Sequence, residues 1–323
     1  NLSTYTGQGK YIQFYMINPS GSDVLNVYLS TNGGSSYGSS LGSYGVNANW
    51  NLITIPIGNS TASNVKIKFT ATSDAGTSDI GIDEVTLKSV VCNGPGTYSV
   101  GPTGTYTSLG NAIASIQSCA PISGAYVLEL QNTYNSSVES FPVTLPSIGG
   151  ASLLNTITIR PAAGVIGKVI SSSNTIATFD INGGKYWIID GRPGGTGLVK
   201  DMTISNTSTS TGGSAIRFVN EGSNNIVEYA ILKSTFPSST SGVVVFGSTT
   251  GANGNDNNKI DNCDVDGSAG SAASPTIAAQ NGIYSAGSTS SVAAYNSGNT
   301  IVSSSIFNWY VTGATSTSCG ILL

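Results

Sequence analysis

Short apolar runs separated by polar turns recur along the second half of the chain. In three segments an aliphatic residue stands two positions after an Asn, and a second aliphatic residue follows five positions later. The leading aliphatic residues are Ile226, Ile260 and Ile301, which lie 34 and 41 positions apart (260 − 226; 301 − 260). A unit that repeats with variable insertions is typical of a solenoid, in which each turn stacks a strand on the previous one.

We predict from this frame that residues from about 101 to 323 form a right-handed parallel β-helix. Stacked Asn side chains can hydrogen bond to one another along such an axis, so Asn224, Asn258 and Asn299 are predicted to form a ladder. An amphipathic helix over residues 107–118 is predicted to cover the open end of the solenoid core. Strands of the first coils are expected at 126–130, 141–145, 156–159, 178–181 and 186–190.

The first part of the chain reads as an all-β module over residues 1–90, followed by a linker at 91–100. Apolar alternation predicts strands at 11–17, 24–30, 51–57, 65–72 and 80–88. Five short strands at this spacing indicate a β-sandwich, which normally has more strands, so we expect it to be incomplete. The last residues begin a strand without a polar cap, and we expect the β-helix to continue in a longer polypeptide.

Composition narrows the range of partners. Only 9% of residues are charged, against about 25% in typical globular chains. The net charge is −4, the sequence pI is near 4.7, and no basic stripe is present, which argues against nucleic acid. No run of 18 apolar residues would insert into a membrane.

The cysteine and histidine counts exclude several chemistries. There are four cysteines and no histidine, which removes zinc sites of the Cys/His type and triads based on histidine. Cys92 and Cys119 bracket the predicted helix, so a disulfide that closes this loop is plausible. The pairing of Cys263 and Cys319 stays open.

Acidic residues supply the candidate metal and catalytic groups. Asp264 and Asp266 share one strand face, with Val265 pointing inward, which could form a Ca²⁺ site or an acidic pair on a groove. Exposed strand ends are the alternative, which we favour because acidic residues commonly sit exposed. Asp79 and Asp83 near the last sandwich strand are further candidates, and Ca²⁺ is the only cofactor suggested.

Aromatic residues in the sandwich loops could stack on sugar rings. Trp50, Tyr37 and Tyr44 are the candidates for such ligand binding. Packing in the core is the alternative for Trp50, and it is the preferred interpretation for Trp187 and Trp309, which fall in predicted strands.

Both halves resemble known modules. The segments NVYLSTNGG at 26–34, VKIKFT at 65–70 and IGIDEV at 80–85, with Trp50, resemble jelly-roll domains of the MAM-like and concanavalin-like type. The segments GTYTSL at 104–109, NTITI at 155–159 and IIDGR at 188–192 resemble the start of pectate-lyase-like β-helices. Such modules occur together in large bacterial surface proteins exported by type IX secretion. The resemblance implies a secreted or surface-attached protein that meets polysaccharide, other surfaces and the secretion machinery, and a structural Ca²⁺ near Asp83.

Two functional hypotheses follow. The preferred one is a non-enzymatic cell-surface adhesin or stalk, used for attachment or gliding motility. The alternative is a polysaccharide lyase or glycoside hydrolase with the sandwich as its carbohydrate-binding module. A groove with recurring Asp plus an Arg or Lys across adjacent coils would favour the enzyme, whereas a flat face of Ser, Thr and Asn would favour the adhesin.

Overall fold

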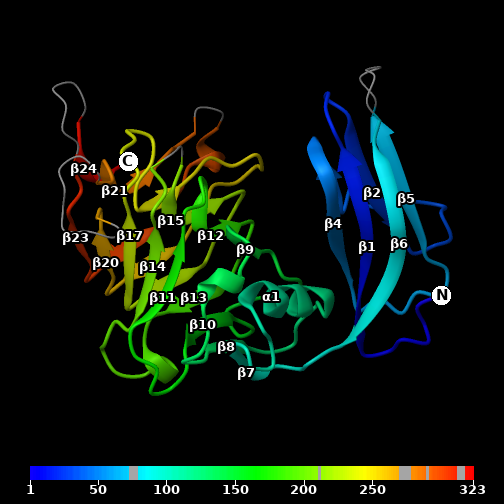
Figure 1. Ribbon diagram of the computed structural model, residues 1–323, viewed down its shortest axis with the longest axis horizontal. Coiled ribbons are helices and arrows are strands. Elements are labelled where there is room, and N and C mark those ends of the chain that lie inside the picture. The colour runs from blue at the N-terminus through cyan, green and yellow to red at the C-terminus, as the bar shows by residue number, and fades with distance from the viewer. Residues whose placement is uncertain (73–78, 210–211, 269–277, 289–290, 311–316) are drawn as a thin grey trace. The chain divides into compact units, whose positions relative to one another are not determined.

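The computed structural model describes residues 1–72, 79–209, 212–268, 278–288, 291–310 and 317–323 (Figure 1). The chain divides into two compact units. We call residues 1–93 with 114–121 the sandwich unit, and residues 94–113 with 122–323 the solenoid unit. In the described part of the chain, no helix has the length and apolar character needed to cross a membrane.

Three parallel sheets build the solenoid unit, as predicted for a parallel β-helix. Sheet I contains β7 (Gly96–Val100), β8 (Tyr126–Leu130), β10 (Ile157–Pro161), β13 (Trp187–Asp190), β16 (Ile226–Glu228), β19 (Lys259–Asp261) and β22 (Thr300–Val302). Sheet II contains β11 (Lys168–Ser172), β14 (Met202–Asn206), β17 (Ala230–Ser234), β20 (Asp264–Asp266) and β23 (Ser305–Phe307). Sheet III contains β9 (Val143–Pro146), β12 (Ala177–Asn182), β15 (Ser214–Val219), β18 (Val244–Phe246), β21 (Asn281–Ser285) and β24 (Cys319–Leu322).

Stacked apolar columns fill the inside of each coil. In sheet I, Ile189, Val227 and Ile260 face one another in successive coils and are fully buried. In sheet III, the rings of Phe218 and Phe246 stack at 4.8 Å between centroids. Successive side chains of a strand point to opposite faces, so each coil contributes alternate residues to this core.

The turn from sheet I to sheet II is short and has one left-handed residue in each of three coils. These residues are Tyr229, Asn262 and Ser303, each with φ 49°. Only a few per cent of non-glycine residues adopt positive φ, and Asn is enriched among them. The same backbone turn in successive coils keeps sheets I and II in register.

An asparagine ladder lies at the corner just before the strands of sheet I, and one of its members differs from the prediction. Asn225, not Asn224, occupies the ladder, because Val227 rather than Ile226 pairs with Ile260 across the strands. The Asn258 Oδ1 accepts hydrogen bonds from the Asn225 backbone N–H (3.1 Å) and Nδ2 (2.9 Å). Asn299 Oδ1 accepts in the same way from Asn258. Two consecutive asparagines fit the repeat in either register, so the sequence alone left a one-residue ambiguity.

A second, shorter ladder lies in the loop before the first. Asn255 and Asn296 repeat the same pattern, since Asn296 Oδ1 accepts from the Asn255 backbone N–H (3.0 Å) and Nδ2 (2.9 Å). The Asn255 Nδ2 also donates to the Gly247 carbonyl. Buried backbone groups that no strand pairs are thereby satisfied by side-chain amides.

The single helix of the described residues, α1 (Leu109–Ser118), begins two residues later than predicted. Its buried face contains Leu109, Ala112, Ile113 and Ile116. At its start, the Glu139 carboxylate accepts hydrogen bonds from the N–H groups of Leu109 (2.6 Å) and Gly110 (3.0 Å). A carboxylate at a helix N-terminus is favourable because it meets unpaired N–H groups and the positive end of the helix dipole.

Two three-stranded antiparallel sheets form the sandwich unit. One has the order β4 (Asn47–Gly58), β1 (Gln8–Asn18), β6 (Gly81–Val91), and the other β3 (Gly42–Tyr44), β2 (Val24–Ser30), β5 (Lys66–Thr72). The core between them contains Ile12, Phe14, Met16, Leu25, Val27 and Ile55. Six described strands are fewer than the eight of a jelly roll, so that topology stays a prediction.

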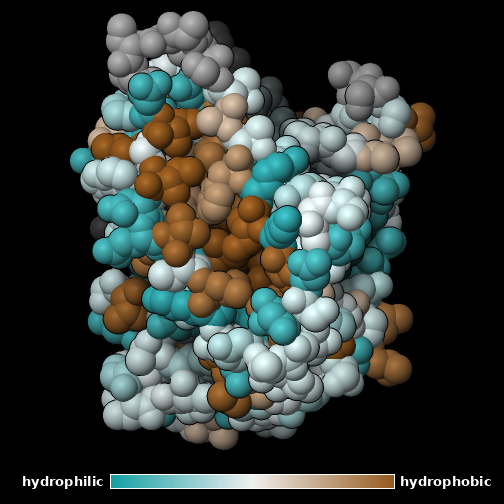
Figure 2. Space-filling view, turned by 90° about the vertical axis from the view of Figure 1, so that its right-hand side faces the viewer, coloured by the Kyte–Doolittle hydropathy of each residue, from teal (hydrophilic) through white to brown (hydrophobic). Residues whose placement is uncertain are grey.

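One side of the sandwich core is open to solvent. Leu87 and Ile82 of β6 pair with the core residues Ile12 and Met16 and therefore face inward. Yet Ile82, Val85 and Leu87 are 37, 49 and 45% exposed. Figure 2 shows a strip of hydrophobic surface on the side of the molecule where β5 and β6 lie in Figure 1.

The stretch predicted to be a linker instead carries the first strand of the solenoid. β7 (Gly96–Val100) pairs in parallel with β8, and β6 continues to Val91. Near this stretch, Cys92 and Cys119 form a disulfide with a Cα–Cα distance of 5.5 Å. The sequence signal at β7 was weak because its run of apolar residues is short and lies next to Gly and Pro.

The ladder register leads to a test by substitution. We expect Asn258→Ala to lower the unfolding free energy of the solenoid unit by about 2–4 kcal/mol, since buried donors of Asn225 lose their acceptor at about 1–3 kcal/mol each. Asn224→Gly is the matched control, because Asn224 lies outside the ladder at φ 60°, and it should stay within about 0.5 kcal/mol of the parent. Urea unfolding followed by circular dichroism measures both, and equal losses would contradict the observed register.

Candidate functional site

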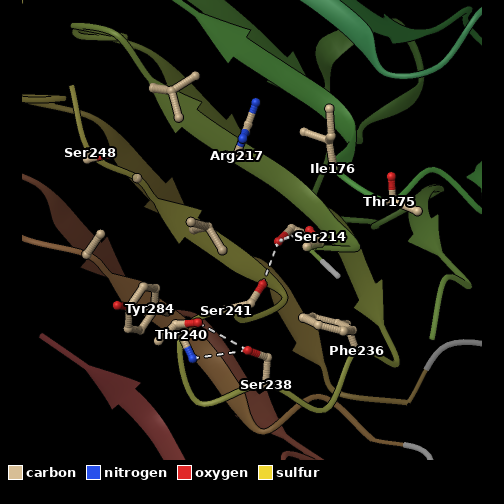
Figure 3. A pocket seen from close by; sticks show the side chains of 15 residues that line it. Thr175, Ile176, Ser214, Arg217, Phe236, Ser238, Thr240, Ser241, Ser248 and Tyr284 are labelled. Atoms are coloured by element: carbon tan, nitrogen blue, oxygen red, sulfur yellow. Dashed lines mark hydrogen bonds between the residues drawn. The ribbon is translucent and has the colours of Figure 1, made fainter. Parts of the chain in front are cut away.

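A groove lies over the outer face of sheet III. One cavity of about 460 Å³ spans strands β15, β18 and β21, the loops at their ends and the residues just before β12. A second, larger hollow of about 710 Å³ adjoins it and shares Ser248, Tyr284 and Ala286 with the first. Figure 3 shows the side chains that line the first cavity. Because these residues come from successive coils, the groove runs along the stacking direction of the solenoid.

The floor of the groove is a single column of outward-facing residues. Strand register aligns Asp180, Arg217, Val245, Tyr284 and Leu322, one from each of five neighbouring strands. Parallel strands are about 4.8 Å apart, so four intervals span about 19 Å. The floor therefore changes in character from a charged end at β12 and β15 to an apolar end at β21 and β24.

One wall comes from the loop between β17 and β18. Phe236 projects from this loop, and Ser238, Thr240 and Ser241 line it with hydroxyl groups (Figure 3). The Ser241 and Ser214 hydroxyls lie 3.3 Å apart, which ties the wall to β15. Hydroxyls and an aromatic ring thus face the same cavity.

The charges of the groove cancel. Arg217 Nε and Nη2 donate to the two carboxylate oxygens of Asp180 at 2.8 and 3.0 Å. The Asp180 side chain is only 5% exposed, so it is held under this bidentate pair. Among the described residues that line the cavity, Arg217 is the only one with a formal charge.

A row of charged residues follows the outer face of sheet I. Register places Glu129, Arg160, Asp190, Glu228 and Asp261 in one column across five coils. Arg160 pairs with Glu129 at 2.7 Å, and Lys259 pairs with Asp261. Three carboxylates therefore occupy consecutive coils at β13, β16 and β19.

Arg192 holds two of these carboxylates together. It donates to Asp190 at 2.8 Å and to Glu228 at 2.7 Å, and it lies 4.3 Å over the Tyr229 ring. Hydrogen bonding to Asp190 raises the pKa of Arg192. Burial and the negative charges of Asp190 and Asp261 raise the pKa of Glu228, and Arg192 offsets this only in part.

The predicted metal residues do not form a cluster. Asp264 pairs with Lys200, and Asp266 Oδ2 lies 3.0 Å from Lys233 Nζ, so each carboxylate forms an ion pair with a lysine ammonium group. Burial acts to raise the pKa of Asp266, but hydrogen bonds from Ser268, Asn308 and Lys233 lower it overall. Asp79 and Asp83 are exposed. Within the part of the chain that the structure describes, no three acidic, Cys or His side chains come together to hold a metal ion.

The three predicted sugar-stacking residues lie at different places in the sandwich unit. Trp50 is 52% exposed, and its ring lies against Gly81. The Lys68 ammonium stands 4.4 Å over the Tyr37 ring, whereas Tyr44 packs edge-on against Phe14 in the core. Burial accordingly raises the pKa of Tyr44. Tyr44 is thus a packing residue in the structure, while Trp50 keeps an accessible face.

The groove residues were not singled out as a site from the sequence. Period-2 alternation around Ile216-Arg217-Phe218 and around Ile283-Tyr284 would have placed Arg217 and Tyr284 on an outer face. Nothing in the sequence shows that the loop carrying Phe236 forms a wall above them. That proximity depends on the number of residues between successive strands.

Comparisons with known proteins assign no family. No family model matches the chain, and no curated protein matches it. Two solved structures of the catalytic domain of a GH87 α-1,3-glucanase, both variants in complex with nigerose, align with 11% identity and TM-scores of 0.20 and 0.18. They cover 98 and 93% of this chain, which spans 65 and 66% of theirs. Similarity at this level establishes neither a shared fold nor a shared activity.

Glu228 leads to a pH-dependent stability prediction. Its folded-state pKa is raised, so the ionised form opposes folding above its ordinary pKa of about 4.3. We expect Glu228→Gln to raise the melting temperature at pH 7, because it removes repulsion from Asp190 and Asp261 while an amide oxygen still accepts from Arg192. The gain should shrink as pH falls toward 4, where the parent carboxyl is protonated.

Thermal unfolding at several pH values checks this prediction. Glu84→Gln serves as the control, because Glu84 is an exposed carboxylate of the sandwich unit. A lower melting temperature for Glu228→Gln at pH 7 would mean that the ion pair with Arg192 outweighs the repulsion.

Proposed function

We propose that the solenoid unit binds an extended carbohydrate polymer in the groove over sheet III, as a non-enzymatic binding protein at a cell surface. The observation that carries this proposal is the lining of the groove. Serine and threonine hydroxyls, two aromatic rings and Arg217, whose charge Asp180 neutralises, line two adjoining hollows along several coils.

The chemistry of this lining suits sugars. Hydroxyl groups donate and accept hydrogen bonds with sugar hydroxyls, and the faces of Phe236 and Tyr284 can pack against the apolar faces of sugar rings. A floor of about 19 Å that is open along the solenoid axis accommodates a chain rather than a single small molecule. These features support binding of a polymer that lies along the groove.

The same lining argues for binding without cleavage. Glycoside hydrolysis uses two carboxylates on either side of the scissile bond, one of them as a protonated acid. On the described floor Asp180 is the one carboxylate, and Arg217 holds both of its oxygens. A carboxylate whose two oxygens both accept from a guanidinium is poorly placed to donate a proton, so the described lining supplies no free carboxyl group for hydrolysis.

Surface location is part of the proposal. Disulfides persist mainly in oxidising compartments outside the cytoplasm, and Cys92 and Cys119 are joined. A low charge content of 9% also suits a protein that stays in contact with neutral surfaces. Export by type IX secretion and a role in attachment or gliding belong to this proposal through the resemblance of both modules to such surface proteins.

A polysaccharide hydrolase is the second candidate, and the carboxylate row on sheet I favours it. Asp190, Glu228 and Asp261 lie on neighbouring strands about 4.8 Å apart, near the separation of about 5–5.5 Å in retaining glycosidases. The raised pKa of Glu228 is a property of a general acid. Ion pairs with Arg192 and Lys259 oppose this role.

Release of reducing ends separates the two candidates. Incubation of the protein with β-glucans, α-glucans, xylan and pectate should release no new reducing ends if the protein only binds. Release that disappears in Glu228→Gln, with binding retained, would establish the hydrolase and overturn the non-enzymatic proposal.

Substitution of the aromatic residues tests the groove. We expect Tyr284→Ala and Phe236→Ala each to weaken binding of the recognised polysaccharide about tenfold, or about 1.4 kcal/mol, through lost stacking. Affinity electrophoresis against a panel of soluble polysaccharides identifies the ligand, and calorimetry measures the change.

Tyr295→Ala is the matched control, because Tyr295 is exposed but does not line the groove. Unchanged binding in both groove variants, with loss in Trp50→Ala, would move the binding site to the sandwich unit. No binding to any polysaccharide by the parent protein would overturn the proposal.

A further inference from the structure

A buried lysine lies inside the sandwich unit without a partner. Lys10 belongs to β1 and pairs with Gly58 and Ser89 on the two neighbouring strands. It alternates with the core residues Ile12 and Phe14, so its side chain enters the sandwich. Lys10 is 1% exposed, and in the described structure its Nζ has no hydrogen-bond partner.

A small cavity lies beside this ammonium. It has a volume of about 90 Å³ and is lined by Leu2, Tyr5, Lys10, Leu87, Lys88 and Ser89. It is about one fifth of the volume of the 460 Å³ cavity over sheet III, and it lies in the other unit of the chain.

The lining has positive charge and no negative charge. Lys10 and Lys88 are both cationic in their ordinary state, and no Asp or Glu is among the lining residues. Burial lowers the pKa of Lys10. A buried ammonium without a counter-charge is strongly unfavourable, so either the amine is neutral or an anion accompanies it.

We propose that this cavity binds the carboxylate of a small molecule or peptide, with Lys10 as the ion-pair partner. Lys10 Nζ donates to the carboxylate inside the cavity, and the Ser89 hydroxyl provides a further donor. Leu2 and Leu87 contact the carbon next to the carboxylate. Lys88 attracts the anion at the entrance.

The cavity size and lining favour a carboxylate over other anions. A carboxylate is planar and carries an apolar substituent, which fits two leucines on one side of a cationic amine. Phosphate and sulfate carry three or four oxygens that need donors in every direction, and few polar side chains line this cavity. The site is independent of the proposed groove, because it lies within the sandwich unit.

Thermal stability in acetate tests the proposal. At constant ionic strength, replacing chloride by acetate should raise the melting temperature of the parent protein along a saturating curve. Lys10→Met keeps the length and removes the ammonium, and its acetate affinity should be at least tenfold weaker. Lys66→Met is the control for a lysine of the same unit that does not line the cavity. Equal acetate responses in the parent and in Lys10→Met would overturn the site.

A measurement on the parent protein keeps the test independent of how the variant folds. Lysine-selective NMR should show one amine signal that shifts with acetate and saturates at the concentration found by melting. The absence of such a saturating signal would overturn the proposal. A capped peptide with one Asp side chain, titrated in parallel, identifies the source. Tighter binding of the peptide indicates a protein carboxylate, and equal or tighter binding of acetate indicates a free small acid.

Discussion

Each coil of the solenoid depends on hydrogen bonds to the coil before and after it. The strands of sheets I, II and III satisfy their backbone groups in this way, and at the corner before sheet I side chains supply part of the pairing. Asn225, Asn258 and Asn299 complete one corner because an amide side chain both donates and accepts. Without that pairing, the buried N–H groups of Asn225 and Asn258 would lose their acceptors, at a cost that adds from one of these coils to the next.

The same stacking of coils produces both the groove over sheet III and the row of charged residues on sheet I. When strands pair in register, outward residues at one position form a column, so five strands create the floor from Asp180 to Leu322. On sheet I the register instead aligns Asp190, Glu228 and Asp261, and like charges at strand spacing repel. Arg192 and Lys259 reduce this repulsion by forming ion pairs with the three carboxylates, so the row is an ion-pair network.

The sandwich unit is stabilised differently, because its two sheets pack face to face around one hydrophobic core. Ile82, Val85 and Leu87 are partly exposed on the inner side of β6, and Lys10 is buried among apolar neighbours. Both features are unfavourable, because apolar side chains remain in contact with water while an ammonium group is removed from it.

The sequence by itself determined the all-β class, the two modules and the repeat, because alternation and the spacing of Asn and aliphatic residues are local properties. It also located the helix and most strands to within a few residues. Only the tertiary structure decided that Asn225 rather than Asn224 enters the ladder, since adjacent asparagines fit the frame equally well. It alone joined Arg217 to Asp180 and brought Phe236 over the column of Tyr284, because loop lengths and strand register set contacts between residues far apart in the chain.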